Sequence, residues 1–232
     1  MGDLTGWQVN SHFATNCSEI PTVFECISFG SCVSNGATSF NSFELTSYPV
    51  LGNGNYSFTT SFYNDTECTV QNRSPMVTSE SANTTFSCTS SDGDDLHYGK
   101  KQKMSLLPDR SFPISPFPGV VENLFGDSSC LSSSSINQFT VFNPSTCFVG
   151  TPSDDETNSP ILSYQYSCGG QGQGEGGNPV LVSYTSGHCV GPFTTTPFNT
   201  TCQYDAETSF HKIYSCGATA ITISISSNRR RL

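Results

Sequence analysis

The stretch Tyr184-Thr-Ser-Gly-His-Cys189 carries the pattern on which the fold assignment rests, an aromatic residue followed five positions later by a cysteine. The residues between them are mostly small and polar, which favours a turn. The pattern recurs along the chain, and a second phrase, aromatic-Ser-Cys, closes the units that it opens. Because self-similarity at a regular interval indicates repeated structural units, we interpret the chain as four cysteine units. The openings are residues 13–17 (one residue shorter), 63–68, 125–130 and 184–189, and the closings are 86–88, 166–168 and 214–216.

Strand and turn signals separate these phrases. Residues 221–226 (ITISIS) alternate apolar and polar side chains, and 138–142 and 180–184 are rich in β-branched and aromatic residues. A single helical turn is expected at 119–125. We therefore expect an all-β fold of tandem, small, disulfide-linked antiparallel β units that can pair into sandwich-like domains. The expected division is an N-terminal β region (1–95, two cysteine units), a proline-containing linker (96–120) and a C-terminal β region (121–232, two cysteine units).

Eleven cysteines are spread through the chain without any C-x-x-C pair, which favours an oxidising compartment over a zinc site. The first ten residues lack the basic start and apolar run of a signal peptide. Either the chain is the processed form of a secreted protein, which we expect, or the extracellular interpretation is wrong. We expect the first and last cysteines of each unit to pair. The scheme is Cys17–Cys32, Cys68–Cys88, Cys130–Cys168 and Cys189–Cys216, with Cys147–Cys202 between units and Cys26 unpaired.

These opening and closing phrases resemble secreted, cysteine-patterned tandem-repeat surface proteins of protists and algae. The resemblance covers most of residues 10–217. It implies a cell-surface or extracellular-matrix setting and no particular activity.

Charge and motifs exclude several functional classes. A net charge of −10 disfavours nucleic acid as a partner, and no apolar stretch is long enough to span a membrane. Neither G-x-S-x-G nor H-E-x-x-H occurs, so we expect no catalytic residue and no enzyme activity. We also expect no metal site and no cofactor. The glycine run 172–177 formally matches a dinucleotide fingerprint, but Asn178-Pro179 follows where a helix would have to continue.

Six Asn-x-Ser/Thr sequons predict N-linked glycans on a secreted chain. We expect sugar on at least two of the first four members of this set: Asn55, Asn64, Asn83, Asn199, Asn16 and Asn72.

From these features we expect an extracellular structural glycoprotein, a self-assembling subunit of a surface filament or coat. The alternative is a cell-surface adhesin or carbohydrate-binding module. In the first case the end of the chain contributes to assembly: the strand at 221–226 either completes its own sheet or adds to a neighbouring copy, and the following arginines reach acidic surface on that copy. The assembly residues are Ile221, Ile223, Ile225, Arg229, Arg230 and Arg231. Trp7, the sole tryptophan, is expected to pack a strand against the body.

Overall fold

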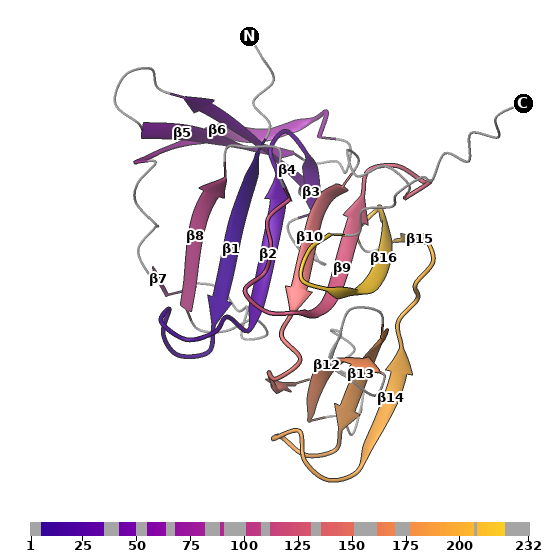
Figure 1. The fold of residues 1–232 in the computed structure, drawn as a ribbon. Coiled ribbons are helices and arrows are strands. Elements are labelled where there is room, and N and C mark those ends of the chain that lie inside the picture. The colour runs from indigo at the N-terminus through magenta and orange to yellow at the C-terminus, as the bar shows by residue number, and fades with distance from the viewer. Residues whose placement is uncertain are drawn as a thin grey trace, which may run out of the picture.

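The computed structural model is all-β, and the residues that it describes contain no helix (Figure 1). The described residues form sixteen strands in three antiparallel sheets, one of eight strands and two of four. The expected all-β, antiparallel, disulfide-linked fold is therefore confirmed. The described residues are 6–34, 42–49, 55–63, 68–81, 89–90, 101–107, 112–130, 136–150, 162–169, 177–206 and 208–220.

The large sheet has the order β15-β16-β9-β10-β2-β1-β8-β7 and spans the middle of the molecule (Figure 1). Its strands come from both ends of the sequence. They are β1 (Trp7–Phe13), β2 (Val23–Ser28), β7 (Thr89–Ser90), β8 (Lys101–Leu107), β9 (Gly119–Phe125), β10 (Ile136–Phe142), β15 (Gln203–Asp205) and β16 (Phe210–Gly217).

Each small sheet is a meander of consecutive strands. The first contains β3 (Cys32–Ser34), β4 (Ser42–Pro49), β5 (Asn55–Tyr63) and β6 (Gln71–Ser81). The second contains β11 (Phe148–Val149), β12 (Ser163–Gly169), β13 (Asn178–Tyr184) and β14 (Phe193–Pro197). The two meanders follow the C-terminal ends of β2 and β10. These two strands pair antiparallel, so the meanders leave the large sheet at opposite ends, as Figure 1 shows.

The order of the large sheet is symmetric about the β2–β10 pair. Every strand on one side of this pair has a counterpart, eight numbers later, at the same distance on the other side. The meanders β3–β6 and β11–β14 correspond in the same way. Disulfides follow the same plan: Cys32–Cys68 joins β3 to the turn after β5, and Cys147–Cys189 joins the residue before β11 to the turn after β13.

The main core lies on one face of the large sheet. Alternation in β1 directs Trp7 and Val9 to this face, where they pack with Phe139 and Val141 of β10. The proline-rich segment 112–118 crosses this face and contributes Phe112 and Phe117. The Ser115 backbone N–H donates a hydrogen bond to the carbonyl of Ala218 at 2.7 Å, which connects this segment to the residues after β16. The expectation that Trp7 packs a strand against the body is confirmed, since only 5% of its surface is exposed.

A second core joins the β11–β14 sheet to the opposite face of the large sheet. Its centre is a series of stacked rings that alternates between the two sheets and the loop after β14. Phe142 stacks on Tyr166 with 3.9 Å between ring centroids, Tyr166 on Phe198 at 5.7 Å, and Phe198 on Tyr214 at 4.3 Å. The disulfide Cys168–Cys216 links β12 to β16 beside this stack. The small sheet is thus fixed to the large one by aromatic packing and a covalent bond.

The expected domain division does not match the strand pairing. β8 lies inside the expected linker and pairs with β1 along its whole length, while β2 of the N-terminal region pairs with β10 of the C-terminal region. The large sheet also takes strands from all four cysteine units. Proline and lysine made 96–120 look like a linker, but Pro113, Pro116 and Pro118 belong to the segment that covers the core.

The helical turn expected at 119–125 is wrong, because these residues form β9. Apolar pairs at Val120-Val121 and Leu124-Phe125 produce a spacing that a helix would also show. In the sheet, β9 is an inner strand whose residues other than the half-buried Glu122 are buried, so apolar residues occur on both of its faces.

All four disulfides between described cysteines differ from the expected scheme. The bonds are Cys32–Cys68, Cys130–Cys202, Cys147–Cys189 and Cys168–Cys216, and Cys17 is also disulfide-bonded. The expected bonds Cys17–Cys32, Cys130–Cys168, Cys189–Cys216 and Cys147–Cys202 are therefore wrong, as is Cys68–Cys88. The first-to-last rule failed because bonds join residues that the sheets bring together, not the ends of sequence units.

Cys26 is the free cysteine among the described residues, in agreement with the expectation that it is unpaired. It is fully buried in the main core. Burial, with a smaller contribution from the charge of Glu25, raises the pKa of its thiol well above the ordinary value. The neutral thiol is a poor nucleophile, so this cysteine acts as a small apolar core residue.

The aromatic-to-cysteine phrase corresponds to a specific local structure. In three of its copies the aromatic residue is the last residue of a strand: Tyr63 of β5, Phe125 of β9 and Tyr184 of β13. The cysteine that follows has a positive φ in each case, 55° at Cys68, 50° at Cys130 and 51° at Cys189. A left-handed backbone is uncommon for a residue other than glycine, so the phrase marks a shared backbone conformation at a cysteine that is held in a disulfide.

Candidate functional site

A row of polar side chains crosses the large sheet on the face opposite the main core. Asn10 pairs with Glu25, Glu25 with Thr140, Thr140 with Glu122, and Glu122 with Tyr214. Paired residues on antiparallel strands point to the same face. These five residues, here called the polar row, therefore lie side by side on β1, β2, β10, β9 and β16, at a strand spacing of about 4.8 Å.

Glu25 forms one centre of the polar row. Its carboxylate accepts hydrogen bonds from Asn10 Nδ2 and from Gln138 Nε2, both at 2.8 Å, and His12 Nε2 lies 3.9 Å away. Burial by itself would raise the pKa of Glu25. The hydrogen bond and charge of His12, together with the hydrogen bond from Asn10, outweigh burial and lower the pKa below its ordinary value.

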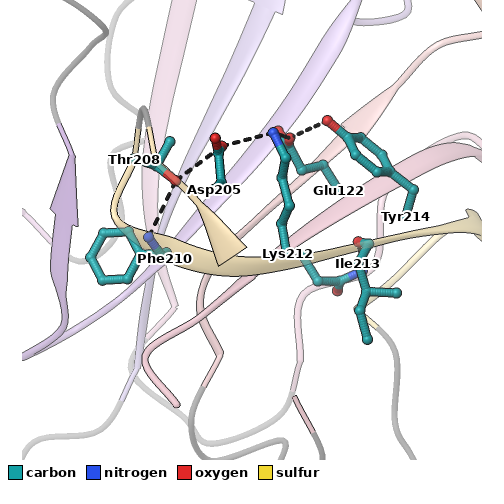
Figure 2. A network of polar contacts seen from close by, with 8 residues as sticks. Glu122, Asp205, Thr208, Phe210, Lys212, Ile213 and Tyr214 are labelled. Carbon is teal, nitrogen blue, oxygen red and sulfur yellow. Dashed lines mark hydrogen bonds and ion pairs between the residues drawn. The ribbon is translucent and has the colours of Figure 1, made fainter. Parts of the chain in front are cut away.

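Glu122 forms the second centre, which Figure 2 shows. Tyr214 donates a hydrogen bond to Glu122 Oε1 at 2.5 Å. Lys212 Nζ lies between two carboxylates, 2.7 Å from Asp205 Oδ2 and 3.9 Å from Glu122 Oε1. Thr208 completes the network by donating to Asp205 at 3.1 Å.

The pKa of Glu122 is shifted in the direction opposite to that of Glu25. Burial raises it, and the negative charges of Asp205 and Glu25 act in the same direction, against the hydrogen bond from Tyr214 and the charge of Lys212. Burial and the neighbouring Glu122 also raise the pKa of the Tyr214 hydroxyl. One face of the sheet thus carries one carboxyl group whose pKa is lowered and another whose pKa is raised.

These opposite shifts predict opposite pH effects on stability. The folded-state pKa of Glu25 is below its unfolded value, so its contribution is present above the unfolded pKa of about 4.3 and is lost as the pH falls. Glu122 has a folded-state pKa above its unfolded value, so its contribution is lost as the pH rises through that pKa. We expect Glu25→Gln to lower the urea midpoint at pH 7, and Glu122→Gln to leave it unchanged or raise it.

Urea midpoints of both variants between pH 3 and 8 provide the measurement. Below the unfolded pKa, at pH 3, the deficit of Glu25→Gln should be smaller than at pH 7. A larger deficit for Glu122→Gln than for Glu25→Gln at pH 7 would contradict the assigned shifts.

The sheet edges are a second feature with functional consequences. Six strands end the three sheets, and four of them have two or three described residues: β3, β7, β11 and β15. Short edges limit pairing with other chains. The other two end strands are longer, β6 with 11 residues and β14 with five, and they lie at opposite ends of the molecule (Figure 1).

β14 presents its outer backbone to solvent, and all five of its residues are exposed. The Phe198 N–H donates a hydrogen bond to the carbonyl of Pro179. This bond establishes which backbone N–H and C=O groups of β14 point toward β13 and which point away from it. Since inward and outward groups alternate, Thr194 and Thr196 face β13, while Phe193, Thr195 and Pro197 face outward. The N–H of Thr195 is therefore available to an added strand.

The expected assembly and glycosylation residues are distributed unevenly. Ile221, Ile223, Ile225 and Arg229 to Arg231 lie outside the described residues, as do Asn64, Asn83 and Cys88. Asn55 is the first residue of β5, and Asn72 lies within β6. Asn16 and Asn199 are exposed in turns. Glycans at these sequons stay predictions.

Asn199 has the geometry of an accessible sequon. Its side-chain oxygen accepts hydrogen bonds from the Thr201 backbone N–H at 2.8 Å and from the Thr201 hydroxyl at 2.6 Å. The asparagine and threonine of this sequon are therefore already in contact at the surface.

Sequence reasoning missed the polar row entirely. Its members come from five strands, and neither β2 nor β9 shows a clean alternation that would have assigned Glu25 and Glu122 to one face. The pairing of β2 with β10 could have revealed it, but strand order does not follow from local patterns.

Among the described residues, no cluster of three or more His, Cys, Asp or Glu is arranged to hold a metal ion. Nor does any helix there have the length and apolarity needed to cross a membrane.

The number and spread of disulfides indicate an oxidising, extracellular environment. No protein-family model, curated protein or solved structure matches the chain.

Proposed function

We propose that the protein is a secreted structural subunit that polymerises into an extracellular filament or coat. The observation that carries the proposal is the pair of long end strands, β6 and β14, at opposite ends of a molecule whose other sheet edges are short. With an open edge strand at each end, β14 of one molecule can pair with β6 of the next, so that molecules add head to tail. Such a heterologous contact produces an open fibre when the rotation between copies does not close a ring.

The correspondence between strands supports this arrangement. We infer that the chain consists of two copies of one eight-strand unit, β1–β8 and β9–β16. β6 and β14 are then equivalent strands. Their prolines, Pro75 and Pro197, occupy the same register relative to Gln71 and Phe193, the residues that begin the two strands. The two units of one chain already join through equivalent strands, β2 and β10. Pairing of β14 of one molecule with β6 of the next would join equivalent strands between molecules in the same way.

A proline at Thr195 tests the proposal. Its N–H faces away from β13, so Thr195→Pro removes an outward donor without breaking the pairing of β13 with β14. We expect the variant to fold and to lose filament formation, measured by negative-stain electron microscopy and by sedimentation over a concentration series.

Thr195→Val is the matched control, because it keeps the N–H and a β-branched side chain, and it should polymerise as the native chain does. If Thr195→Pro and native protein form filaments equally well, β14 is not an assembly edge. If native glycosylated protein stays monomeric at every concentration, the structural function itself is wrong.

Secretion and N-linked glycans belong to this proposal. A chain with many disulfides and exposed sequons at Asn16 and Asn199 fits passage through the secretory pathway. Intact-mass measurement of native material before and after deglycosylation tests this part of the proposal separately from assembly.

A further inference from the structure

We propose that the polar row is a binding site for an uncharged oligosaccharide, which lies across the strands of the large sheet. This function goes beyond assembly and uses a different surface. The polar row is partly open to solvent, since 24% of the Glu25 side chain and 22% of the Glu122 side chain are exposed.

Polar groups without partners point to a ligand here. Thr140 lies between Glu25 and Glu122 in the register and is only 7% exposed. Within the part of the chain that the structure describes, no group forms a hydrogen bond with its hydroxyl. Gln8, two residues from Asn10 on the same face of β1, has the one side-chain oxygen that is both buried and without a hydrogen-bond partner among the described residues. Unsatisfied buried polar atoms are costly, and a hydrogen-bonding ligand would remove that cost.

The hydrogen-bonding groups that remain available in the polar row indicate which groups a ligand must carry. Gln8 Oε1 is an acceptor, and the carboxylates of Glu25, Glu122 and Asp205 are acceptors with remaining capacity. A ligand for this face must therefore donate many hydrogen bonds. Three carboxylates and a net charge of −10 repel anionic polymers. Sugar hydroxyls donate hydrogen bonds without adding negative charge.

The extent of the polar row favours an elongated ligand over a small one. Asn10 and Tyr214 are four strand spacings apart, about 19 Å at about 4.8 Å each. A single ammonium group or metal ion would satisfy one point of this row. An oligosaccharide carries donors along its whole length and can engage several strands at once.

The polar row is also directional. If β1–β8 and β9–β16 are two equivalent units, they meet where Glu25 of β2 is paired with Thr140 of β10. These two equivalent positions therefore carry different residues. Two glutamates facing each other at this point would repel. Threonine avoids that repulsion and leaves a hydroxyl free to contact a ligand, which gives the two directions along the row different chemistry.

Isothermal titration of the disulfide-intact full chain tests the site. The probes are cellohexaose, mannohexaose, xylohexaose and laminarihexaose, each at up to about 5 mM, where weak binding is still measurable. We expect at least one to bind. Thr140→Val removes an unpartnered hydroxyl and should weaken binding about tenfold, as expected for loss of a hydrogen bond to the ligand. Thr195→Val, on an exposed strand of another sheet, should leave binding unchanged.

Two results would overturn the proposal: no binding by any of the four hexasaccharides, or equal affinity of native protein and Thr140→Val. If Thr140→Val does not fold, amide shifts of the native protein during the titration locate the ligand instead. Shifts confined to residues away from β1, β2, β9 and β10 would then exclude the polar row. Because Thr195→Pro can be titrated as well, binding and assembly are measured independently.

Discussion

Replacing both Cys168 and Cys216 with serine is expected to lower the free energy of unfolding by about 4 kcal/mol, because the bond closes a loop with a sequence separation of 48. Besides this chain-entropy effect, the variant loses the disulfide between β12 and β16, so the β11–β14 sheet is held to the large sheet by the packing of the second core. Urea unfolding followed by the fluorescence of Trp7 measures the loss. Hydrogen exchange should show faster opening of β12 and β13 than of β2 and β10.

The double variant of Cys147 and Cys189 is the matched control. That bond has a similar separation, 42, but lies at the β11–β14 sheet and does not reach the large sheet. The entropic losses should be nearly equal. A difference between the variants in exchange at β16 therefore reports the link between sheets. Identical exchange patterns would show that the aromatic stack alone fixes the small sheet.

Phe139→Ala is expected to cost about 3–5 kcal/mol, since it removes a large side chain from a packed core. Phe139 is fully buried in the centre of β10, with its ring 5.5 Å from that of Trp7 and 6.5 Å from that of Phe112. The substitution thus weakens both the sheet and its contact with the covering segment 112–118. A loss of this size is a large share of the stability of an ordinary domain.

Ile114→Ala provides the comparison within the same covering segment. Its side chain is 74% exposed, and surface substitutions away from special features usually change stability by less than about 0.5 kcal/mol. Thermal and urea unfolding of both variants measure the contrast. Similar losses in Phe139→Ala and Ile114→Ala would mean that this face of the sheet is not a packed core.

The sequence was sufficient where local pattern determines structure. The β-rich runs at 138–142 and 180–184 lie in β10 and β13, and Trp7 is buried as expected. These signals depend on a side chain and its immediate neighbours. The same local reading failed for β9, where burial on both faces removes the alternation that identifies a strand.

Strand order and cysteine pairing could not be read in this way. Cys130 bonds Cys202 because β9 and β16 are neighbours in the sheet, although many residues separate them. The polar row depends on the same long-range pairing, since Glu25 and Glu122 share a face only once β10 lies between β2 and β9. Local propensity contains no information about which strands meet.

The β2–β10 junction also has a consequence for synthesis on the ribosome. Glu25 contacts Gln138 across 113 positions of sequence, so β2 has to wait for its partner until more than half of the chain has emerged. During that interval β2 exposes an apolar strand with an unpaired backbone edge, a state that favours association with other nascent chains. A chaperone that covers β2 until β10 arrives would be expected to suppress this association. Its folding rate should be set by this late, long-range closure and not by the formation of the two meanders.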